Sequence, residues 1–421
     1  MDFVFEGCLS GEAEAVFFIW VVCFRLQLLS SRFLRRYKCT AQFIIDSLFS
    51  WFYLLLMFRA FFIYILLIGS LFAADDVFNV RNFGAIGDGS VSDTIAIQRA
   101  IDAAAKVNGT VFFPDGRYRC AGLKTYANIK LKGEPKWGYS VSYGANLILD
   151  DYSAECLIDI TDSRNIHISG LNLNASRKPN SKTHGIMFDK KGKPRNSDTD
   201  TITIEDCKIR GFSGHGVYLR GVFVLIIRRC MINKNLGSGV ECSGCDFYVI
   251  DNVFGANGKY GFGGRVSSGM FTHNRVEWNE SYGLYLGRGG NYWNIVGNQF
   301  DHNHGAGVFI DGVWSVAING NAFRRNGRNS AKLFEGENSA NLLVRSKGVS
   351  VAGNTFMAGH TDGKKDYYTP RFGILFADSE NCTAIANTMH HGYTEAPVKA
   401  VGKFENCEVK DNPHSPHPQN Y

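Results

Sequence analysis

Residues 201–220 read TITIEDCKIRGFSGHGVYLR, and this stretch carries the pattern that decides the fold. A short run of alternating apolar and polar residues leads to Cys207, and the apolar Ile209 follows two positions later. A few polar residues, Gly216 and a second alternating run complete the unit. Alternation with a period of two, bounded by turn residues, is typical of β-strands rather than helices.

The same unit returns along the rest of the chain. The position of Cys207 is taken in turn by Cys207, Cys230, Asn252, Asn274, Asn298, Asn321, Asn354, Asn387 and Asn412. Successive members are 22 to 24 residues apart through Asn321, and then 33, 33 and 25 residues apart. A glycine column keeps the same phase at Gly185, Gly216, Gly239, Gly261, Gly283, Gly307 and Gly373. The repeat predicts an all-β solenoid, a parallel β-helix in which coils stack about 4.8 Å apart.

The asparagine column predicts a structural ladder, because inward amides at one corner of successive coils can pair along the axis. Two cysteine pairs occupy equal phases in neighbouring units, Cys207 with Cys230 and Cys382 with Cys407. Stacked neighbours lie within reach of a disulfide, although buried cysteines also serve as small apolar core residues. We favour the core interpretation, and the sequence leaves the disulfide open.

Ahead of the repeats lies a second recognisable pattern. Residues 78–89 read FNVRNFGAIGDG, residues 92–104 read SDTIAIQRAIDAA, and residues 109–118 read GTVFFPDGRY. The middle segment has helical apolar spacing, and Ser92 or Asp93 suits its N-cap. A helix across the open end of a solenoid would protect the core and cover the edge strands.

These motifs resemble the N-terminal module of the pectate-lyase-like superfamily, in particular its rhamnogalacturonase/epimerase-like pectate lyase domains. Here Ser92 replaces the first Asp of the family's acidic pair. The resemblance implies a right-handed parallel β-helix with an N-terminal capping helix, and a polysaccharide as partner. It carries over no catalytic residue, because the motif positions are structural and the fold hosts several reactions. The His215-Gly216 step is similar to an element of polygalacturonases, but their other elements are missing, and we reject that assignment.

The first part of the chain has a different composition. Met57-Phe58-Arg59, an apolar run and small residues up to Ala74 form the pattern of an export signal at residues 57–73. An uncleaved membrane anchor or a folded N-terminal element would also fit this segment. We therefore divide the chain into a leader (1–74), a cap module (75–133) and β-helix coils (134–421), and expect a secreted, periplasmic or cell-surface location.

Charge narrows the class of partner. The formal net charge is +6, and the basic residues are scattered without a stripe of interleaved aromatics. This disfavours nucleic acid and is compatible with an anionic polysaccharide. The oligomeric state is not encoded in any pattern we recognise.

The candidate site consists of the residue before each glycine of the column and the outward residues of the strand that follows. In its alternation Val217 and Leu219 point inward, while Tyr218 and Arg220 point outward. Reading equal phases in every unit gives one face with His, Tyr, Arg and carboxylate side chains on consecutive coils. The catalytic candidates are His215, Tyr218, Arg220, Glu241 and Asp189. The substrate-binding candidates are His184, Tyr260, Arg265, Tyr282, Tyr285, Arg288, Phe309 and Asp311. Longer units at residues 174–183, 190–198, 328–341 and 359–372 predict loops that wall this face.

These residue types suit a lyase that cleaves an acidic polysaccharide by β-elimination. Tyr218 or His215 would take the proton beside the uronate carboxylate, and Arg220 or Arg265 would neutralise the developing charge. No cofactor is required, although Glu241 and Asp189 could instead hold Ca²⁺ through their oxygens. The same two carboxylates could serve a glycoside hydrolase. A uronate epimerase and a non-catalytic glycan-binding or adhesion protein are also compatible with this face.

A separate cluster lies on another edge of the predicted coils. It contains Glu277, Trp278, Asp301, His302 and His304. These residue types make it a minor candidate for a second site or a metal.

Overall fold

The computed structural model describes residues 47–48, 50–61, 63, 76–161, 163–178, 182–190, 201–327, 339–360, 362, 367–368 and 370–416. The chain divides into two compact units, residues 1–74 and residues 75–421. In the first unit residues 50–61 are helical. Among the helices that the structure describes, none combines the length and the apolar character needed to cross a bilayer. Most of the predicted leader lies outside the described residues, so export stays a prediction.

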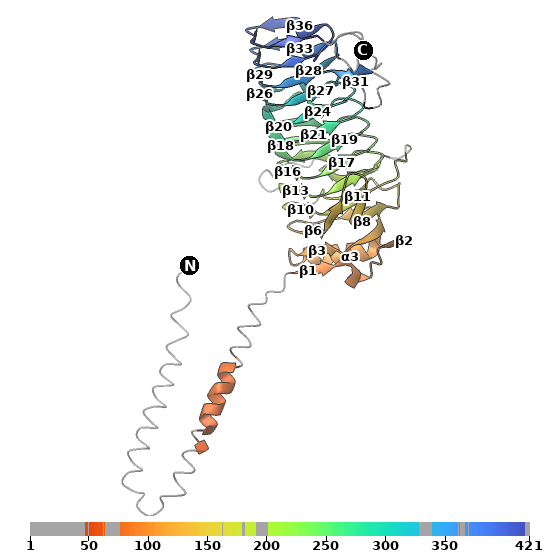
Figure 1. The fold of residues 1–421 in the computed structure, drawn as a ribbon. Helices are drawn as coiled ribbons and strands as arrows, with labels where there is room; N and C mark the ends of the chain where they lie inside the picture. The colour runs from red at the N-terminus through yellow and green to blue at the C-terminus, as the bar shows by residue number, and fades with distance from the viewer. Residues whose placement is uncertain are drawn as a thin grey trace, which may run out of the picture. The chain divides into compact units, whose positions relative to one another are not determined.

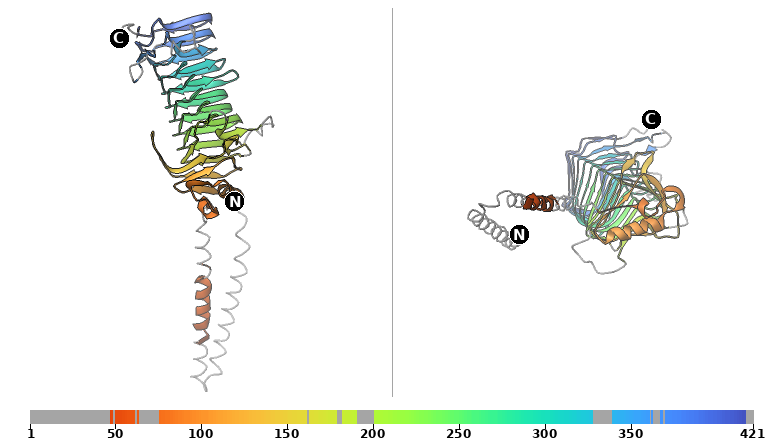
Figure 2. Two further views of the ribbon diagram at one scale, coloured as in Figure 1. Left: turned by 90° about the vertical axis from the view of Figure 1, so that its right-hand side faces the viewer. Right: turned by 90° about the horizontal axis from the view of Figure 1, so that it is seen from below.

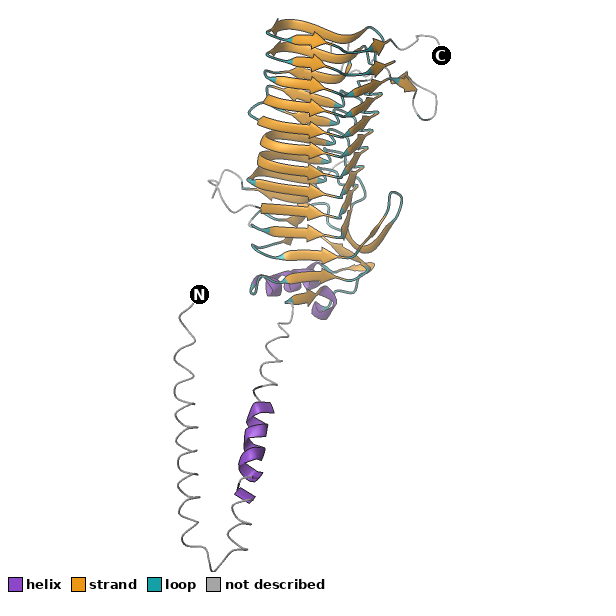
Figure 3. Cartoon of the chain, turned by 60° about the vertical axis from the view of Figure 1, so that its left-hand side comes forward, coloured by secondary structure: helices purple, strands orange, loops and turns teal. Residues whose placement is uncertain are grey.

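The second unit is a right-handed parallel β-helix, as the repeat and the resemblance predicted (Figures 1 and 3). Its strands form three faces along the axis, which we name by their roles below. The groove face consists of β5 (Leu123–Lys124), β9 (Cys156–Asp159), β12 (His184–Asp189), β15 (Val217–Val222), the first half of β18 (Val240–Ile250), the first half of β20 (Phe262–Thr272), β22 (Leu284–Leu286), β25 (Val308–Asp311), β28 (Ala340–Arg345), β33 (Phe372–Glu380) and β36 (Ala396–Glu405).

The back face lies around the next corner. It consists of β1 (Val77–Asn79), β3 (Thr110–Phe113), β6 (Lys130–Gly133), β10 (Ile166–Ser169), β13 (Thr201–Glu205), β16 (Val224–Arg228), the second halves of β18 and β20, β23 (Asn291–Val296), β26 (Trp314–Asn319), β29 (Val349–Ala352), β34 (Thr383–Ile385) and β37 (Glu408–Lys410). Since β18 and β20 run through both faces, the groove and back faces form one 22-stranded sheet.

The third face is a separate 12-stranded sheet. It consists of β2 (Asp88–Ser92), β4 (Gly116–Cys120), β7 (Pro135–Trp137), β8 (Ser142–Leu149), β11 (Leu171–Asn174), β14 (Lys208–Arg210), β17 (Met231–Asn233), β19 (Val253–Gly255), β21 (Arg275–Glu277), β24 (Gln299–Asp301), β27 (Ala322–Arg324) and β30 (Thr355–Met357). Two short pairs, β31 (Gly359–His360) with β32 (Tyr367–Tyr368) and β35 (Met389–His390) with β38 (His414–Ser415), complete the strands.

The β7–β8 hairpin covers part of the third face. The buried ammonium of Lys208 donates to the carbonyl oxygens of Gly138, Tyr139 and Val141 at 2.8, 3.2 and 2.9 Å. The indole of Trp137 donates to the carbonyl of Asp206 at 2.7 Å. These bonds hold the hairpin against the coils, so this part of the third face is occupied by the chain itself.

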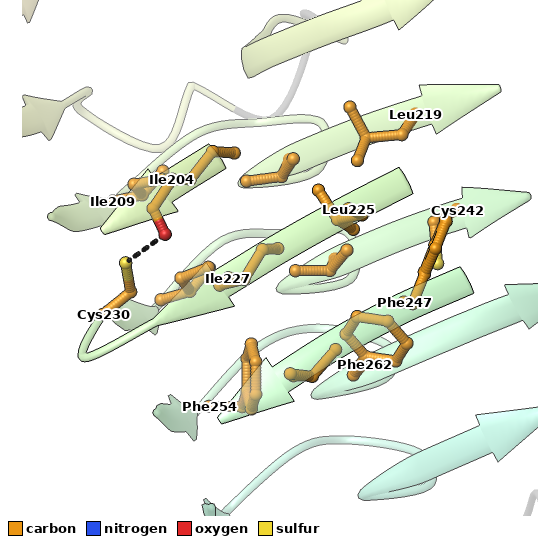
Figure 4. Packing of buried hydrophobic residues seen from close by; sticks show 14 of the residues in the cluster. Ile204, Ile209, Leu219, Leu225, Ile227, Cys230, Cys242, Phe247, Phe254 and Phe262 are labelled. Atoms are coloured by element: carbon orange, nitrogen blue, oxygen red, sulfur yellow. Dashed lines mark hydrogen bonds between the residues drawn. The ribbon is translucent and has the colours of Figure 1, made fainter. Parts of the chain in front are cut away.

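The interior is filled by the inward member of each alternating pair. Val217, Leu219, Leu225 and Ile227 are buried and belong to one continuous core, which Figure 4 shows in part. At one corner five phenylalanines stack along the axis, with neighbouring ring centroids 4.8 to 6.2 Å apart. They are Phe254, Phe271, Phe300, Phe323 and Phe356. The inward and outward positions predicted for the strand 217–220 are therefore confirmed.

The predicted asparagine ladder is confirmed. The side-chain amide of Asn274 donates to Oδ1 of Asn298 at 3.1 Å, and the backbone N–H of Asn274 donates to the same oxygen at 2.8 Å. Equivalent bonds join every neighbouring pair from Asn252 to Asn412. Each ladder amide thus supplies hydrogen-bond partners to backbone groups that are buried at the turn.

A second ladder, which the sequence did not reveal to us, runs along another corner. Its members are Asn235, Asn257, Asn279, Asn303, Asn326 and Asn341. The amide of Asn257, for example, donates to Oδ1 of Asn279 at 3.0 Å. The two buried ladders therefore fix the register of the coils at the two corners that flank the third-face strands, and the second ladder lies at the corner that leads into the groove face.

The cap differs from the prediction in one detail. The helix α3 (Thr94–Ala105) follows the short 3₁₀ segment η1 (Val80–Phe83) and packs at the end of the solenoid (Figure 2). Asp93 precedes the helix as expected, but its carboxylate makes no capping bond to the helix. It accepts hydrogen bonds from the backbone N–H groups of Ile86 and Gly87 at 2.6 and 3.2 Å. The acidic residue of this motif therefore holds the preceding turn rather than the helix start.

Neither predicted cysteine pair forms a disulfide: Cys207, Cys230, Cys382 and Cys407 are free thiols, and the first three are buried as core residues. Cys230 is buried, and its thiol donates to the carbonyl of Ile204 at 3.5 Å (Figure 4).

Removing one rung of a ladder should destabilise the fold markedly. In Asn274→Ala the neighbouring Asn252 loses the acceptor of its two donors, and buried amide groups without partners cost about 3 kcal/mol together. Urea unfolding followed by circular dichroism would measure this loss. The matched change Asn294→Ala, at an exposed strand position, should stay within about 0.5 kcal/mol. Equal losses in the two variants would contradict the role of the ladder.

Candidate active site

The outward columns of the groove face lie in the predicted register. Tyr218 pairs with Glu241 on the next coil, and Arg220 pairs with Asp189 on the previous coil. Ser243 lies next to Arg220 on the following coil, and Arg265 lies next to Ser243 one coil farther on. Residues that are 22 to 31 positions apart in sequence thus become neighbours on one surface.

Two histidines and a tyrosine form a stack beside these columns. The rings of His184 and His215 are 5.1 Å apart, and the ring of Tyr218 lies 4.8 and 5.6 Å from them. The backbone N–H of His215 donates to Nδ1 of His184, and the backbone N–H of Ser238 donates to Nδ1 of His215, both at 2.9 Å. A backbone N–H can only donate, so each Nδ1 is an acceptor and each neutral ring carries its proton on Nε2.

Burial keeps both imidazoles neutral. It lowers the pKa of His184 to about 4, helped by the neighbouring His215, and it lowers the pKa of His215 to about 4, helped by the charge of Lys259. Both histidines therefore cap turns with Nδ1 and offer only an Nε2–H donor at neutral pH. This arrangement favours Tyr218 over His215 as the group that takes a proton.

A hollow of about 540 Å³ opens next to this stack. Its polar and aromatic lining consists of Tyr218, Arg220, Glu241, Ser243, Lys259, Tyr260, Arg265 and Tyr285. The carboxylate of Glu241 accepts from the hydroxyl of Ser238 at 2.8 Å and pairs with the ammonium of Lys259 at 3.2 Å. Six of the thirteen predicted site residues meet at this hollow, and they come from β15, β18, β20, β22 and the turn before β20.

Positive charge dominates the hollow. Arg220 is 61% exposed and lies 3.8 Å from Asp189, while the exposed Arg265 has no ion-pair partner among the described residues. Lys259 lies over the ring of Tyr260 at 4.4 Å, and burial raises the pKa of that phenol to about 12. Three cations against one carboxylate make the hollow suited to an anionic ligand. Lys259 was not predicted; the only sequence signal was its place directly before Tyr260.

Farther along the groove face, several of the predicted substrate-binding residues are buried by contacts within the protein. Phe309 is only 6% exposed and packs with Leu343, Phe372 and Leu375 in a small outer apolar cluster, so our expectation of an open sugar platform there was wrong. Tyr282 packs on the same cluster. Phe309 is buried because its neighbours on the following coils are mainly aliphatic.

Asp311 is also buried, at 7% exposure, and is held by basic partners. Its carboxylate accepts from Nε of Arg345 at 2.9 Å and from the hydroxyl of Tyr285 at 3.3 Å, and Arg288 lies 3.9 Å away. Asp311 and Arg288 therefore form an ion-pair network at the edge of the hollow rather than part of its lining.

The second cluster predicted from the sequence, around Asp301 and His302, is held by contacts within the protein. Among the described residues, no three His, Cys, Asp or Glu side chains stand together as metal ligands. Asp301 pairs with Arg325 through two oxygens at 2.9 and 2.6 Å, and His302 stacks on Trp278 at 3.8 Å. That cluster is an ion pair packed against an aromatic pair. Most of the predicted loop walls, at residues 179–181, 191–198, 328–338 and 363–366, lie outside the described residues.

The two buried histidines should make the protein acid-sensitive. Their folded pKa of about 4 lies below the value near 6.5 of an unfolded histidine, so the unfolded chain takes up protons first. Stability should be constant above about pH 6.5 and fall towards pH 4, by up to about 3 kcal/mol per histidine. Denaturant midpoints across this range would measure the slope. His184→Asn and His215→Asn should each flatten it, and the change His273→Asn at an exposed position should not.

Comparisons with known proteins agree with this architecture. A family model described as "Right handed beta helix region" matches residues 194–356 and 264–417. Mannuronan C5-epimerase AlgE5 of Azotobacter vinelandii is 29% identical over 266 residues, which are 56% of this chain and 24% of that relative. Alginate lyase 7 of the same organism is 59% identical over 46 residues, 11% of this chain and 5% of that relative. The solved A-module of the epimerase AlgE6 superimposes with a TM-score of 0.58 at 21% identity, and covers 81% of this chain and 100% of the module. This chain thus spans about a quarter or less of the full length of these two curated relatives.

Proposed function

The chain belongs to the right-handed β-helix family, and from that premise we propose that it is a polysaccharide-active enzyme that removes the C5 proton from uronate residues. The observation that carries the proposal is the hollow on the groove face. There Arg220, Lys259 and Arg265 surround Tyr218 and Glu241 in one concave, cationic site. The likeness to mannuronan epimerases and to an alginate lyase adds support for this class of substrate.

Arginine suits the first requirement of this chemistry. Removing the C5 proton leaves its electron pair on the adjacent carboxylate as an enediolate, which must be neutralised. Arg265 is exposed in the hollow without an ion-pair partner among the described residues, so its guanidinium is available to grip that carboxylate through two bonds. Arg220, already near Asp189, is the second cation of the pair.

In this proposal Tyr218 acts in its phenolate form, whose oxygen takes the C5 proton and becomes the neutral phenol, and His215 orients it. The Nδ1 atom of His215 is committed to the backbone N–H of Ser238, so the ring offers a donor rather than a base. Tyr218 stacks directly on both histidines and lines the hollow, which fixes the direction of its phenol. Glu241 is engaged by Lys259 and Ser238, and Asp189 by Arg220, so we propose that turnover needs no divalent cation at these carboxylates.

The enediolate can react in two ways. Return of a proton to the other face of C5 gives epimerisation, and the matches to mannuronan C5-epimerases over more than half of this chain favour it. Loss of the C4–O bond, with a proton passed to the leaving oxygen, gives the β-elimination that the sequence suggested. The short, highly similar segment shared with Alginate lyase 7 keeps elimination as the second candidate.

Turnover of polymannuronate and polygalacturonate in D₂O would test the reaction. Deuterium at C5 without new ultraviolet absorbance is expected for epimerisation, and absorbance from a new C=C bond is expected for elimination. New reducing ends without either signal would mean hydrolysis and would overturn the proposal.

Two substitutions should separate chemistry from binding. Tyr218→Phe should lower kcat by about 10²-fold or more because the proton acceptor is lost. Arg265→Gln should lower kcat/KM by about 10- to 100-fold because a charge-assisted contact to the carboxylate is lost. The matched changes Tyr143→Phe and Arg324→Gln, at exposed positions outside the groove face, should leave both constants unchanged. Unaltered kinetics of Tyr218→Phe would contradict its role.

A further inference from the structure

A second aromatic surface lies on the back face, around the corner from the groove. Four large side chains there are well exposed on successive coils: Tyr248 (42%), Met270 (39%), Tyr292 (60%) and Trp314 (49%). Tyr248 pairs in register with Met270, and Trp314 pairs with Asn291, the residue before Tyr292. Exposed apolar side chains are ordinary when scattered, but a contiguous run over neighbouring coils indicates a contact surface.

Tyr248, Met270 and Tyr292 line a hollow of about 400 Å³, and Trp314 precedes Ser315, which also lines it. Its polar lining consists of Asp246, Ser268, Asn294 and Ser315. Within the described residues, none of these four side chains makes a hydrogen bond to another part of the protein. The hollow therefore presents free hydroxyl, amide and carboxylate groups next to aromatic faces, the combination that binds the polar edges and apolar faces of a sugar ring.

Tyr292 is placed there against its backbone preference. It lies at a corner where Asp246, Ser268 and Ser315 hold the equivalent positions, and all four residues have φ between 54° and 61°. This left-handed conformation suits Asp and Ser better than a bulky aromatic residue. The core does not need the ring, because the adjacent Trp293 fills the interior at 2% exposure. The rings of Tyr292 and Trp314 are 5.5 Å apart and tilted by 55°, so they form an angled pair at the edge of the hollow.

We propose that this back-face surface is a second glycan-binding site that takes neutral sugar residues. The charges of the two hollows decide the class of ligand. The groove hollow has Arg220, Lys259 and Arg265 in its lining, whereas the back-face hollow has Asp246 as its one charged residue and no Lys or Arg. A uronate would meet an unneutralised carboxylate on the back face, while an uncharged pyranose would stack on Tyr292 and Trp314 and bond to Ser268 and Asn294.

The site does not depend on the proposed reaction. It lies on another face of the solenoid and shares no lining residue with the groove hollow. Binding at this surface would hold a polysaccharide of mixed composition, or a neighbouring neutral glycan, on the same enzyme.

Calorimetric titration of the full chain with neutral gluco-, manno-, galacto- and xylo-hexasaccharides would test the proposal. At least one should bind with a Kd below about 1 mM and change tryptophan fluorescence through Trp314. Tyr292→Ala and Trp314→Ala should each weaken that binding about tenfold or more. The control Tyr143→Ala, an equally exposed tyrosine on the β7–β8 hairpin, should not. A mannuronate hexamer should bind with the same Kd to Tyr292→Ala and to the unaltered protein.

Three outcomes would overturn the proposal. One is that no neutral hexasaccharide binds in this range. Another is that binding survives in the double variant Tyr292→Ala/Trp314→Ala. The last is that the double variant abolishes only a concentration-dependent self-association in sedimentation velocity, which would make the surface a contact between two copies of this chain. Loss of uronate turnover in Arg265→Gln, measured separately, reports on the groove and leaves this test intact.

Discussion

The side-chain amide of each ladder asparagine donates to the next coil while its oxygen accepts from the coil before, and the rest of the molecule depends on this bond. Asn274 alone takes part in bonds to Asn252, Asn298 and the carbonyl of Val249. A buried amide left without these partners would cost more than its net contribution when paired, so slipping the register by one residue is strongly disfavoured. Two such ladders lie at the two corners of the third face, and the one that contains Asn257 and Asn279 also adjoins the start of the groove-face strands, so the coils cannot shift against each other there.

The register between neighbouring strands also places residues of equal phase in the repeat side by side on one surface. Because Tyr218 is opposite Glu241 and Arg265 is opposite Ser243, side chains far apart in the chain are held about 5 Å apart by the coils beneath them. The site therefore needs little support from its own contacts. Arg265 can remain without an ion-pair partner in the described structure because its position is set by the backbone ladder, and such a charge is ready for a ligand.

The same logic explains what could be predicted from the sequence. The period, the inward and outward positions of residues 217–220 and the ladder from Asn252 follow from spacing alone, since equal phase means physical adjacency in a solenoid. The roles of individual side chains do not follow from spacing. Phe309 has the right phase for an exposed platform, but Leu343, Phe372 and Leu375 on neighbouring coils bury it. Lys259 lies outside the columns that were compared, and only the folded turn brings its ammonium to Glu241. Asp93 was placed correctly before its helix, yet its bonds go backwards to Ile86 and Gly87, a choice that depends on the turn's three-dimensional path.

In our proposals, the two hollows let one repeat support different kinds of recognition. On the groove face the outward positions carry cations, which suit a charged substrate and a reaction that develops negative charge. Around the corner, the same coils carry aromatic rings with free hydroxyls and an amide, which suit binding without chemistry. Since β18 and β20 pass through both faces, the ladders that align Glu241 with its neighbours also align Tyr248 with Met270. A substitution inside the solenoid would therefore disturb both surfaces together, whereas a substitution at an outward position changes one surface and leaves the other as it was.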